Sequence, residues 1–191
     1  MQLWVMSDWH WKHKNIYTFT NASGVRIRER FADATEGDAY MEQRCHDLIK
    51  GPDHVWYLGD WTMFRGKHLA EEFIKFRKSL PGHWRIIPGN HDHYAMEIYI
   101  RAGFEKIRGS NMLDGLLMTH YPVHESSIGP RVLGNVHGHT HGNPDISPRH
   151  LNVCVERTNY EPIPIEEVKT RLKAKALPPT TDVNGVEVTG P

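Results

Sequence analysis

The stretch Leu3-Trp4-Val5-Met6-Ser7-Asp8-Trp9-His10 runs from four apolar residues almost directly into a carboxylate and an imidazole. A short apolar run bounded by polar residues is typical of a buried strand. Asp8 and His10 are two positions apart, so in extended backbone both side chains project from one face. This stretch therefore predicts a buried strand that ends at a pair of potential metal ligands.

The same arrangement, a buried strand followed by a ligand-type side chain, recurs three more times. Residues 54–58 lead into Gly59-Asp60, residues 84–87 into Pro88-Gly89-Asn90-His91-Asp92, and residues 116–119 into His120. In open α/β sheets, ligands bind at the carboxyl ends of the strands. We therefore expect these side chains to meet at one edge of a sheet.

Helical patterns separate the first strands. Apolar residues recur at helical spacing in 38–50 and 67–80, each followed by Pro and Gly, and 93–102 is a shorter candidate helix. Strands that alternate with helices indicate βαβ units and a largely parallel first sheet. The second half is rich in strands, expected at 104–107, 111–113, 116–119, 132–136 and 151–155, which would form a second sheet packed on the first. A last helix is predicted at 164–173.

The chain of 191 residues is expected to form a single domain over residues 1–175. Residues 11–37 have no clear period and predict a long loop beside the first ligand pair. The stretch 176–191 contains several Pro, Thr and Gly residues and predicts a loosely ordered C-terminal tail.

The charge balance and the apolar content exclude several classes of function. Lys and Arg together number 23, as do Asp and Glu, whereas strong non-specific binding to DNA needs a basic excess. No apolar run is long enough to span a membrane, and the first residues indicate a strand, not a signal peptide. Cys45 and Cys154 lack a ligand-like spacing, so we expect reduced thiols and a cytoplasmic protein.

Two further imidazoles complete a set of potential metal ligands. His139 and His141 are again two positions apart, in a turn that begins at Gly138, where glycine lets the backbone approach closely. The whole set contains four imidazoles, two carboxylates and one carboxamide: Asp8, His10, Asp60, Asn90, His120, His139 and His141. These donors are too many for one ion and suit two, with a carboxylate bridging. Nitrogen and oxygen donors suit manganese, iron, zinc or nickel.

The order of these motifs resembles the signature of the calcineurin-like metallophosphoesterases. The resemblance is carried by Asp8-x-His10, Gly59-Asp60, Gly89-Asn90-His91-Asp92, His120 and Gly138-x-x-His141, over residues 8–141. The chain is most similar to short single-domain bacterial and phage members, although it has Arg30-Phe31-Ala32 where those relatives usually have Arg-Pro-Phe. The resemblance implies an α/β fold, a four-layer αββα sandwich of two mixed β-sheets flanked by helices.

The resemblance also implies how the metal ions are held and what they do. Asp8, His10 and His141 would hold one ion, and Asn90, His120 and His139 the other, with Asp60 bridging. Two divalent transition-metal ions are expected, manganese first, with iron, zinc or nickel as alternatives. A water held between the ions would lose its proton and attack the phosphorus while both ions clamp the phosphoryl oxygens.

Four residues near the ligands are candidates for other roles. His91 follows a ligand without belonging to the set, so it could protonate the leaving alkoxide as a general acid. Asp92 could orient the imidazole of His91, with an ordinary position near a helix N-terminus as the alternative. His13 and Asn15 are expected to contact the substrate, with a solvated loop as the alternative.

Two groups of side chains are better explained by structure than by binding. Arg26, Arg28 and Arg30 could capture a second phosphate or a nucleic-acid strand, but the interspersed acids favour a solvated, internally paired segment. Trp9, Trp11 and Trp61 could stack a base, although tryptophan packs more often than it binds.

These features predict a hydrolase of phosphomonoesters or phosphodiesters. The candidate substrates are a nucleotide, a cyclic nucleotide or a nucleic-acid end, and no residue selects among them. Ser/Thr protein phosphatases are disfavoured, because their second motif resembles Gly-Asp-x-x-Asp-Arg-Gly and this chain continues from Asp60 with Trp61-Thr62-Met63-Phe64. The alternative is a metal-poor interaction scaffold on the same fold, against which the complete ligand set argues. Nothing in the sequence indicates the oligomeric state.

Overall fold

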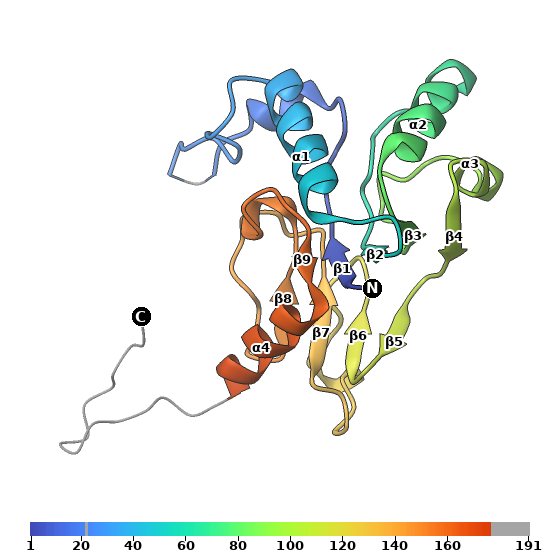
Figure 1. The fold of residues 1–191 in the computed structure, drawn as a ribbon. Helices are drawn as coiled ribbons and strands as arrows, with labels where there is room; N and C mark the ends of the chain where they lie inside the picture. Colours follow the sequence, from blue (N-terminus) through green and yellow to red (C-terminus); the bar gives the residue numbers. More distant parts are fainter. Residues whose placement is uncertain (22, 177–191) are drawn as a thin grey trace.

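Two β-sheets pack face to face between helices in the computed structural model, which describes residues 1–21 and 23–176 (Figure 1). The tail expected at 176–191 lies outside the described residues from residue 177 onward. The strands are β1 (Leu3–Met6), β2 (His54–Tyr57), β3 (His83–Ile86), β4 (Phe104–Ile107), β5 (Asn111–Leu113), β6 (Leu116–Met118), β7 (Gly134–His137), β8 (His150–Asn152) and β9 (Ile163–Pro164). The helices are α1 (Ala34–Leu48), α2 (Lys67–Ser79), α3 (Met96–Arg101) and α4 (Ile165–Ala176), with short 3₁₀ helices η1 (Lys14–Tyr17), η2 (Glu125–Ser127) and η3 (Val155–Arg157). The expected sandwich of two mixed sheets flanked by helices is confirmed.

The first sheet has the strand order β4-β3-β2-β1-β9. The four strands β1 to β4 run parallel, with His54 opposite both Leu3 of β1 and His83 of β3, and β9 is antiparallel to β1. The expectation of a largely parallel first sheet is therefore confirmed. The assignment of residues 104–107 to the second sheet was wrong, because α3 carries the chain across from β3 so that β4 pairs parallel to it, as in other βαβ units.

The second sheet has the strand order β5-β6-β7-β8. β5 and β6 form an antiparallel hairpin, whereas β6, β7 and β8 run parallel. The hairpin turns at Asp114-Gly115, where both residues have positive φ (48° and 78°), as the favoured two-residue hairpin turns require.

Side chains alternate along the central strands between two cores. Val5, Trp56 and Leu58 point toward the second sheet and pack with residues such as Met118 and Val136. The neighbouring strand residues Met6, Val55 and Tyr57 point to the opposite face. There they belong to one core with residues of α1, α2 and α3, namely Met41, Cys45, Phe73 and Tyr99. The central strands β1 and β2 are thus packed on both faces, which explains why they are nearly continuous apolar runs in the sequence.

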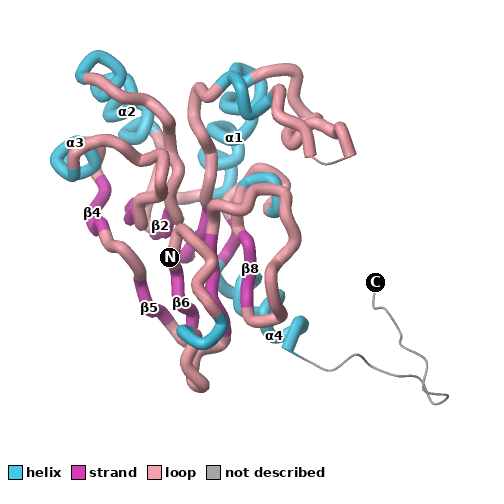
Figure 2. The backbone as a smooth tube through the Cα atoms, turned by 180° about the vertical axis from the view of Figure 1, so that it is seen from behind, coloured by secondary structure: helices cyan, strands magenta, loops and turns pink. Residues whose placement is uncertain are grey.

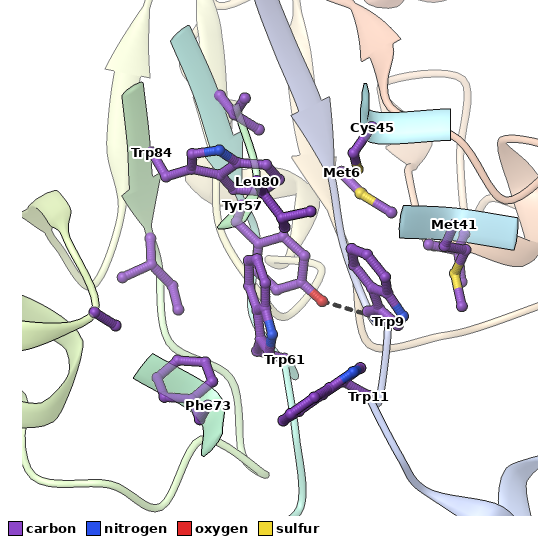
Figure 3. Close-up of a cluster of buried hydrophobic side chains, with 14 of the residues drawn as sticks. Met6, Trp9, Trp11, Met41, Cys45, Tyr57, Trp61, Phe73, Leu80 and Trp84 are labelled. Atoms are coloured by element: carbon purple, nitrogen blue, oxygen red, sulfur yellow. Dashed lines mark hydrogen bonds between the residues drawn. The ribbon is translucent and has the colours of Figure 1, made fainter. Parts of the chain in front are cut away.

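The tryptophans beside the ligand motifs belong to the core. Trp9 and Trp61 are fully buried and Trp11 is 6% exposed, and Trp9 and Trp61 stack with ring centroids 5.7 Å apart (Figure 3). The main-chain N–H of Trp9 donates to the hydroxyl of Tyr57 at 2.7 Å. The interpretation of these residues as packing residues is confirmed.

The boundaries of the helices differ from the expected ones, and α3, expected from residue 93, begins at Met96. α1 begins at Ala34, four residues earlier than expected, because the carboxylate of Asp33 accepts from the N–H groups of Thr35 and Glu36 and caps the helix. α4 begins at Ile165, because the preceding residues form β9 beside β1. α4 contacts β1, β8 and β9 and so touches both sheets. Figure 2 shows α1, α2 and α3 gathered toward one end of the molecule and α4 toward the other.

Candidate metal centre

Five of the seven predicted ligands have left-handed backbone. φ is 61° at Asp8, 52° at His10 and 57° at Asp60. It is 69° at His139 and 49° at His141. The premise that Asp8 and His10 share a face of extended backbone was therefore wrong, because the chain leaves β1 in a tight turn. Left-handed conformation is strained for residues other than glycine, and such strain concentrates at functional sites.

Hydrogen bonds along the main chain hold the first two turns against each other. The N–H groups of Asp8, His10 and Trp11 donate to the carbonyl groups of Gly59, Asp60 and Trp61, at 3.0, 3.1 and 2.7 Å. The pairing of β1 with β2 thus continues past the strands. It brings the carboxylates of Asp8 and Asp60 to the same edge of the sheet, as expected.

The first group of ligand atoms belongs to Asp8, His10 and His141. Nε2 of His10 and Nε2 of His141 lie 3.8 and 3.9 Å from Oδ1 of Asp8. Among the described residues, Asp8 Oδ1 and both ring nitrogens of His10 are buried without a hydrogen-bond partner. Buried polar atoms without a partner are costly, and a metal ion between them would remove that cost. These residues therefore fit a metal ion.

The second group of ligand atoms belongs to Asp60, His120 and His139. Nε2 of His120 lies 3.5 Å from Oδ2 of Asp60 and 2.9 Å from Oδ1 of Asn90, so the carboxamide joins this group. Nδ1 of His120 lies 2.7 Å from the carbonyl oxygen of Leu58. Because a carbonyl only accepts, a proton on Nδ1 satisfies this contact and would leave the lone pair of Nε2 for a metal ion, to which Oδ1 of Asn90 would be a neighbouring ligand.

Asp60 lies between the two groups. Its Oδ2 is 3.6 Å from Nε2 of His10 in the first group and 3.5 Å from Nε2 of His120 in the second. The structure thus gathers the seven residues into the two groups that the resemblance implies, with Asp60 in the bridging position. The binding of metal ions at these groups stays a prediction.

In each carboxylate one oxygen is held by the protein and the other faces the centre. Oδ2 of Asp8 accepts from the hydroxyl of Ser7, from the N–H of His139 at 2.9 Å and from the thiol of Cys154 at 3.2 Å. Oδ1 of Asp60 accepts from the N–H of His91 at 2.8 Å. The free oxygens, Asp8 Oδ1 and Asp60 Oδ2, are the ones that face the imidazoles.

Two glycines allow these close approaches. A Cβ at Gly138 would overlap Oγ of Ser7 and Oδ2 of Asp8, and a Cβ at Gly89 would overlap Oδ1 of Asp60. Glycine is therefore required at both places by the space that the carboxylates occupy.

The carboxylates and imidazoles of the two ligand groups shift one another's pKa values. Burial alone would raise the pKa of Asp8, but the nearby imidazoles of His10, His141 and His120 hold that pKa well below its usual value. Burial lowers the pKa of His10 and favours the neutral ring that a metal requires. Burial opposes a charge on His141, but the adjacent Glu156 raises its pKa.

Glu156 is a functional candidate that the sequence did not indicate, and Arg28, which it did bring up, has a different position from the one expected. Oε1 of Glu156 lies 3.2 Å from Nδ1 of His141 and accepts from Nε of Arg28 at 2.8 Å. The interpretation of Arg28 as part of a solvated segment was wrong, because its side chain is fully buried. The pairing joins residues 128 positions apart, so no local pattern could have revealed it.

His91 lies beside the centre without joining either group. Its half-buried ring is 5.4 Å from that of His10 between centroids. The sequence suggested that the carboxylate of Asp92 orients the His91 ring, but this carboxylate has other partners. It accepts from the N–H groups of Gly89, Asp60 and Trp61 at 2.8, 2.8 and 3.0 Å and so ties two ligand turns together. The alternative of a helix N-terminal position was also wrong, because α3 begins only at Met96. Burial raises the pKa of Asp92 to about 6.

The two candidate substrate residues differ in their positions. The ring of His13 is 5.8 Å from that of His10, and burial together with the nearby His10 and His91 lowers its pKa to about 4. Asn15 is exposed in η1, where its main-chain carbonyl accepts from Thr18 and Phe19. His13 therefore borders the centre, whereas no contact between the Asn15 side chain and the ligand groups occurs in the described part of the chain.

A cleft of about 720 Å³ opens beside His139 and His141. One wall is formed by residues of the long loop, among them Arg26 and Arg30, and the other by the turn that follows β7. Nη1 of Arg30 donates to Oδ1 of Asn159 at 2.6 Å, whereas Nη2 of Arg26 reaches only the carbonyl of Glu29 at 3.3 Å among the described residues. The cleft thus connects the metal ligands with a cationic side chain that is largely free.

Comparison with known proteins places these findings in a family. The family model described as calcineurin-like phosphoesterase matches residues 1–174. A crystal structure of a protein of unknown function from Aquifex aeolicus is similar with a TM-score of 0.65 and 22% identity, over 88% of this chain and 98% of that one. The nuclease MPE from Pseudomonas putida matches with a TM-score of 0.47 and 17% identity, over 73% of this chain and 61% of that one. No curated protein matches the chain.

Within residues 1–21 and 23–176, no helix has the length and apolar character needed to cross a membrane.

Proposed function

The chain belongs to the calcineurin-like phosphoesterase family, and we propose that it hydrolyses phosphate esters at two metal ions held by the residues described above. The observation that carries this proposal is the pair of ligand groups that share Asp60, whose Oδ2 lies about equally far from His10 and His120. Manganese is the proposed ion at both groups, with iron, zinc or nickel as alternatives, because all the ligand atoms are nitrogen or oxygen.

The chain's own residues would divide the work as follows. When bound, two such ions supply a nucleophile by lowering the pKa of water, and they neutralise charge on the phosphoryl group. Asp8, His10 and His141 would hold one ion, and Asn90, His120 and His139 the other. His91, held beside Asp60 through its main-chain N–H, would protonate the leaving oxygen. His13, beside His10, would contact the phosphoryl group. Asn15, exposed in η1, keeps its proposed role only if the substrate extends along that helix.

The substrate would lie in the cleft beside His139 and His141. A volume of about 720 Å³ falls within the range of sites for small organic ligands. Arg26 on the far wall offers a guanidinium group to an anion beyond the scissile phosphate. A nucleotide, a cyclic nucleotide or a nucleic-acid end combines such a phosphate with an organic body, and we propose this class.

The alternative function, an interaction scaffold that has lost its metals, is disfavoured by the same geometry. A scaffold has no need to keep unpartnered buried atoms such as Asp8 Oδ1 and His10 Nε2 aimed at one point. A cytoplasmic location is proposed because Cys45 and Cys154 are free, buried thiols, as is usual in reducing compartments.

The decisive experiment is a screen of the metal-reconstituted protein. Metal-free protein would be loaded with Mn²⁺, Zn²⁺, Ni²⁺ or Fe²⁺ and assayed against nucleoside monophosphates, cyclic nucleotides, dinucleotides and p-nitrophenyl esters. We expect metal-dependent hydrolysis of at least one ester and its loss in the Asp60→Asn variant. Absence of hydrolysis in every metal form, from protein that holds two ions, would overturn the proposal and favour the scaffold.

A further inference from the structure

A buried carboxylate lies behind the first ligand group and takes no part in it. Glu156, at the centre of η3, is only 3% exposed at its side chain. Its Oε1 lies 3.2 Å from Nδ1 of His141, so a proton on Nδ1 leaves Nε2 free to face Asp8. A carboxylate in this position fixes both the tautomer and the orientation of a metal-binding histidine.

The guanidinium group of Arg28 connects this carboxylate to the turn that carries the other two ligands. Nε donates to Glu156 at 2.8 Å, Nη2 to the carbonyl of Asp8 at 2.7 Å and Nη1 to the carbonyl of Trp9 at 2.8 Å. A second contact of Nη1, to the hydroxyl of Tyr17, is 3.3 Å long. One side chain thus holds the main chain on both sides of the Asp8–Trp9 peptide bond. Lysine could not reproduce this, because it lacks a planar fork of donors.

An ion pair this deeply buried is not explained by stability alone. The side chains of Arg28 and Glu156 are 0% and 3% exposed, and removal of two charges from water costs about as much as their attraction returns. Moreover, Oε2 of Glu156 is buried without a hydrogen-bond partner among the described residues. The pair therefore calls for a functional explanation, and its contacts lead to the first ligand group.

Among the described residues, no charged side chain supports the second ligand group in a comparable way. Nδ1 of His120 faces a neutral carbonyl, that of Leu58. In the described part of the chain, the ring nitrogens of His139 make no hydrogen bond. The two groups therefore differ in the electrostatics behind their histidines, although their ligand atoms are similar.

We propose that Glu156 and Arg28 are positioning residues for the first metal site and give it an affinity that is set separately from that of the second. Glu156 orients His141, and Arg28 holds the turn of Asp8 and His10 in register with it. The inference rests on the metal centre of the proposed function, but it concerns how the ions are held and not which ester is cleaved.

The test is a metal titration of the Glu156→Gln variant. The change keeps the volume and removes the charge. Equilibrium dialysis against graded Mn²⁺, followed by metal analysis, would count the ions, and circular dichroism would verify the fold. We expect one site to keep its affinity and the other to weaken by about 10- to 100-fold. Arg28→Lys should weaken the same site. If that variant does not fold, Glu156→Gln alone decides.

Glu161→Gln is the matched control. Glu161 accepts from Nε of Arg44 at 2.8 Å, the same distance and donor type as in the Glu156 pair, but outside the ligand groups. Both metal sites should be unchanged in this variant.

Double variants identify which site is affected. In a His141→Ala background, which lacks a ligand of the first site, Glu156→Gln should cause no further loss of metal. In a His139→Ala background, Glu156→Gln should lower the affinity for the one ion that still binds. Three outcomes would overturn the inference. They are the reverse pattern in the double variants, an equal loss of affinity at both sites, and an unchanged affinity at both sites in folded Glu156→Gln protein.

The outcomes separate this inference from the proposed function. Wild-type protein that hydrolyses esters while Glu156→Gln binds both ions normally would refute the inference alone. Wild-type protein that cleaves no ester while Glu156→Gln loses one site would refute the function alone. Wild-type protein that binds no metal would refute both.

Discussion

At the scale of single residues, the two oxygens of each carboxylate in the candidate metal centre have different surroundings. In Asp8 and Asp60, protein donors hold one oxygen, so the position of the other is fixed before any ion arrives. Such fixed ligands avoid the entropy cost of ordering side chains when the ion binds. The left-handed backbone of Asp8 and Asp60 costs free energy, and the surrounding hydrogen bonds hold it in place.

Asp60→Asn should weaken the binding of both metal ions, by at least about 10-fold each. The amide keeps an oxygen that can accept from the N–H of His91 but removes the negative charge between the two groups. Metal analysis after dialysis measures the loss. Asp114→Asn, in the exposed hairpin turn, is the control and should bind two ions. Loss of a single ion from Asp60→Asn would contradict the bridging position.

His91→Ala should keep two metal ions and lose turnover on esters with poor leaving groups. A general acid contributes about 10²- to 10⁴-fold, and alkoxide leaving groups need the proton most. The ratio of rates on an alkyl and a p-nitrophenyl ester is the measurement, and it should fall in the variant. His93→Ala removes an exposed neighbour whose ring contacts Arg65, and that ratio should not change. An unchanged ratio in His91→Ala would remove His91 from the mechanism.

At the scale of elements, the ligand turns are held by their neighbours more than by their own sequence. The main-chain pairing of β1 with β2 continues through the turns, and Asp92 ties the turn after β3 to the turn after β2. α1 contributes as well. The carboxylate of Asp38 accepts from Nε1 of Trp9 at 3.0 Å and from the N–H of Lys12 at 2.8 Å, and so it flanks the first turn.

Asp38 should make stability depend on pH in an identifiable way. Burial raises its pKa to about 6, so the folded protein binds this proton more tightly than the unfolded chain does. The stabilising contribution is complete below pH 4 and is lost as the pH rises through 6, a change of about 3 kcal/mol. Urea unfolding at pH 4 to 7 should therefore show wild type losing stability relative to Asp38→Asn.

The comparison isolates one group, because the other titrating residues are common to both proteins. A constant difference between wild type and Asp38→Asn across this pH range would show that folding leaves the pKa of Asp38 unchanged, and would contradict the prediction.

At the scale of the whole molecule, the metal centre lies where the two sheets meet. The turns after β1, β2 and β3 supply Asp8, His10, Asp60 and Asn90, and the second sheet supplies the three other histidines. A β-bridge between Ser7 and Cys154 joins the ends of the two sheets at the same place. Ions bound here would therefore connect the two halves of the sandwich.

Metal binding should raise the thermal stability of the molecule. A ligand present at 100 times its dissociation constant stabilises the folded state by about 2.7 kcal/mol per site. For a chain of this size the Tm should rise by roughly 5–10 °C for each occupied site. Differential scanning calorimetry with EDTA and with Mn²⁺ measures the shift. Asp60→Asn should show a much smaller one, and an equal shift in that variant would place the stabilising ions elsewhere.

The sequence by itself determined most of the elements of this protein and the residues of the two candidate ligand groups. Buried strands show as apolar runs, and a ligand-type residue directly after such a run must lie at the end of a strand, so Asp8, Asp60, Asn90 and His120 could be named. The tertiary structure decided what depends on distant residues. It assigned β4 to the first sheet, set the left-handed turns, gave the carboxylate of Asp92 three main-chain donors and paired Arg28 with Glu156. The physical reason is that periodicity and turn chemistry act over a few residues, whereas burial and pairing of charges are fixed only when remote segments pack.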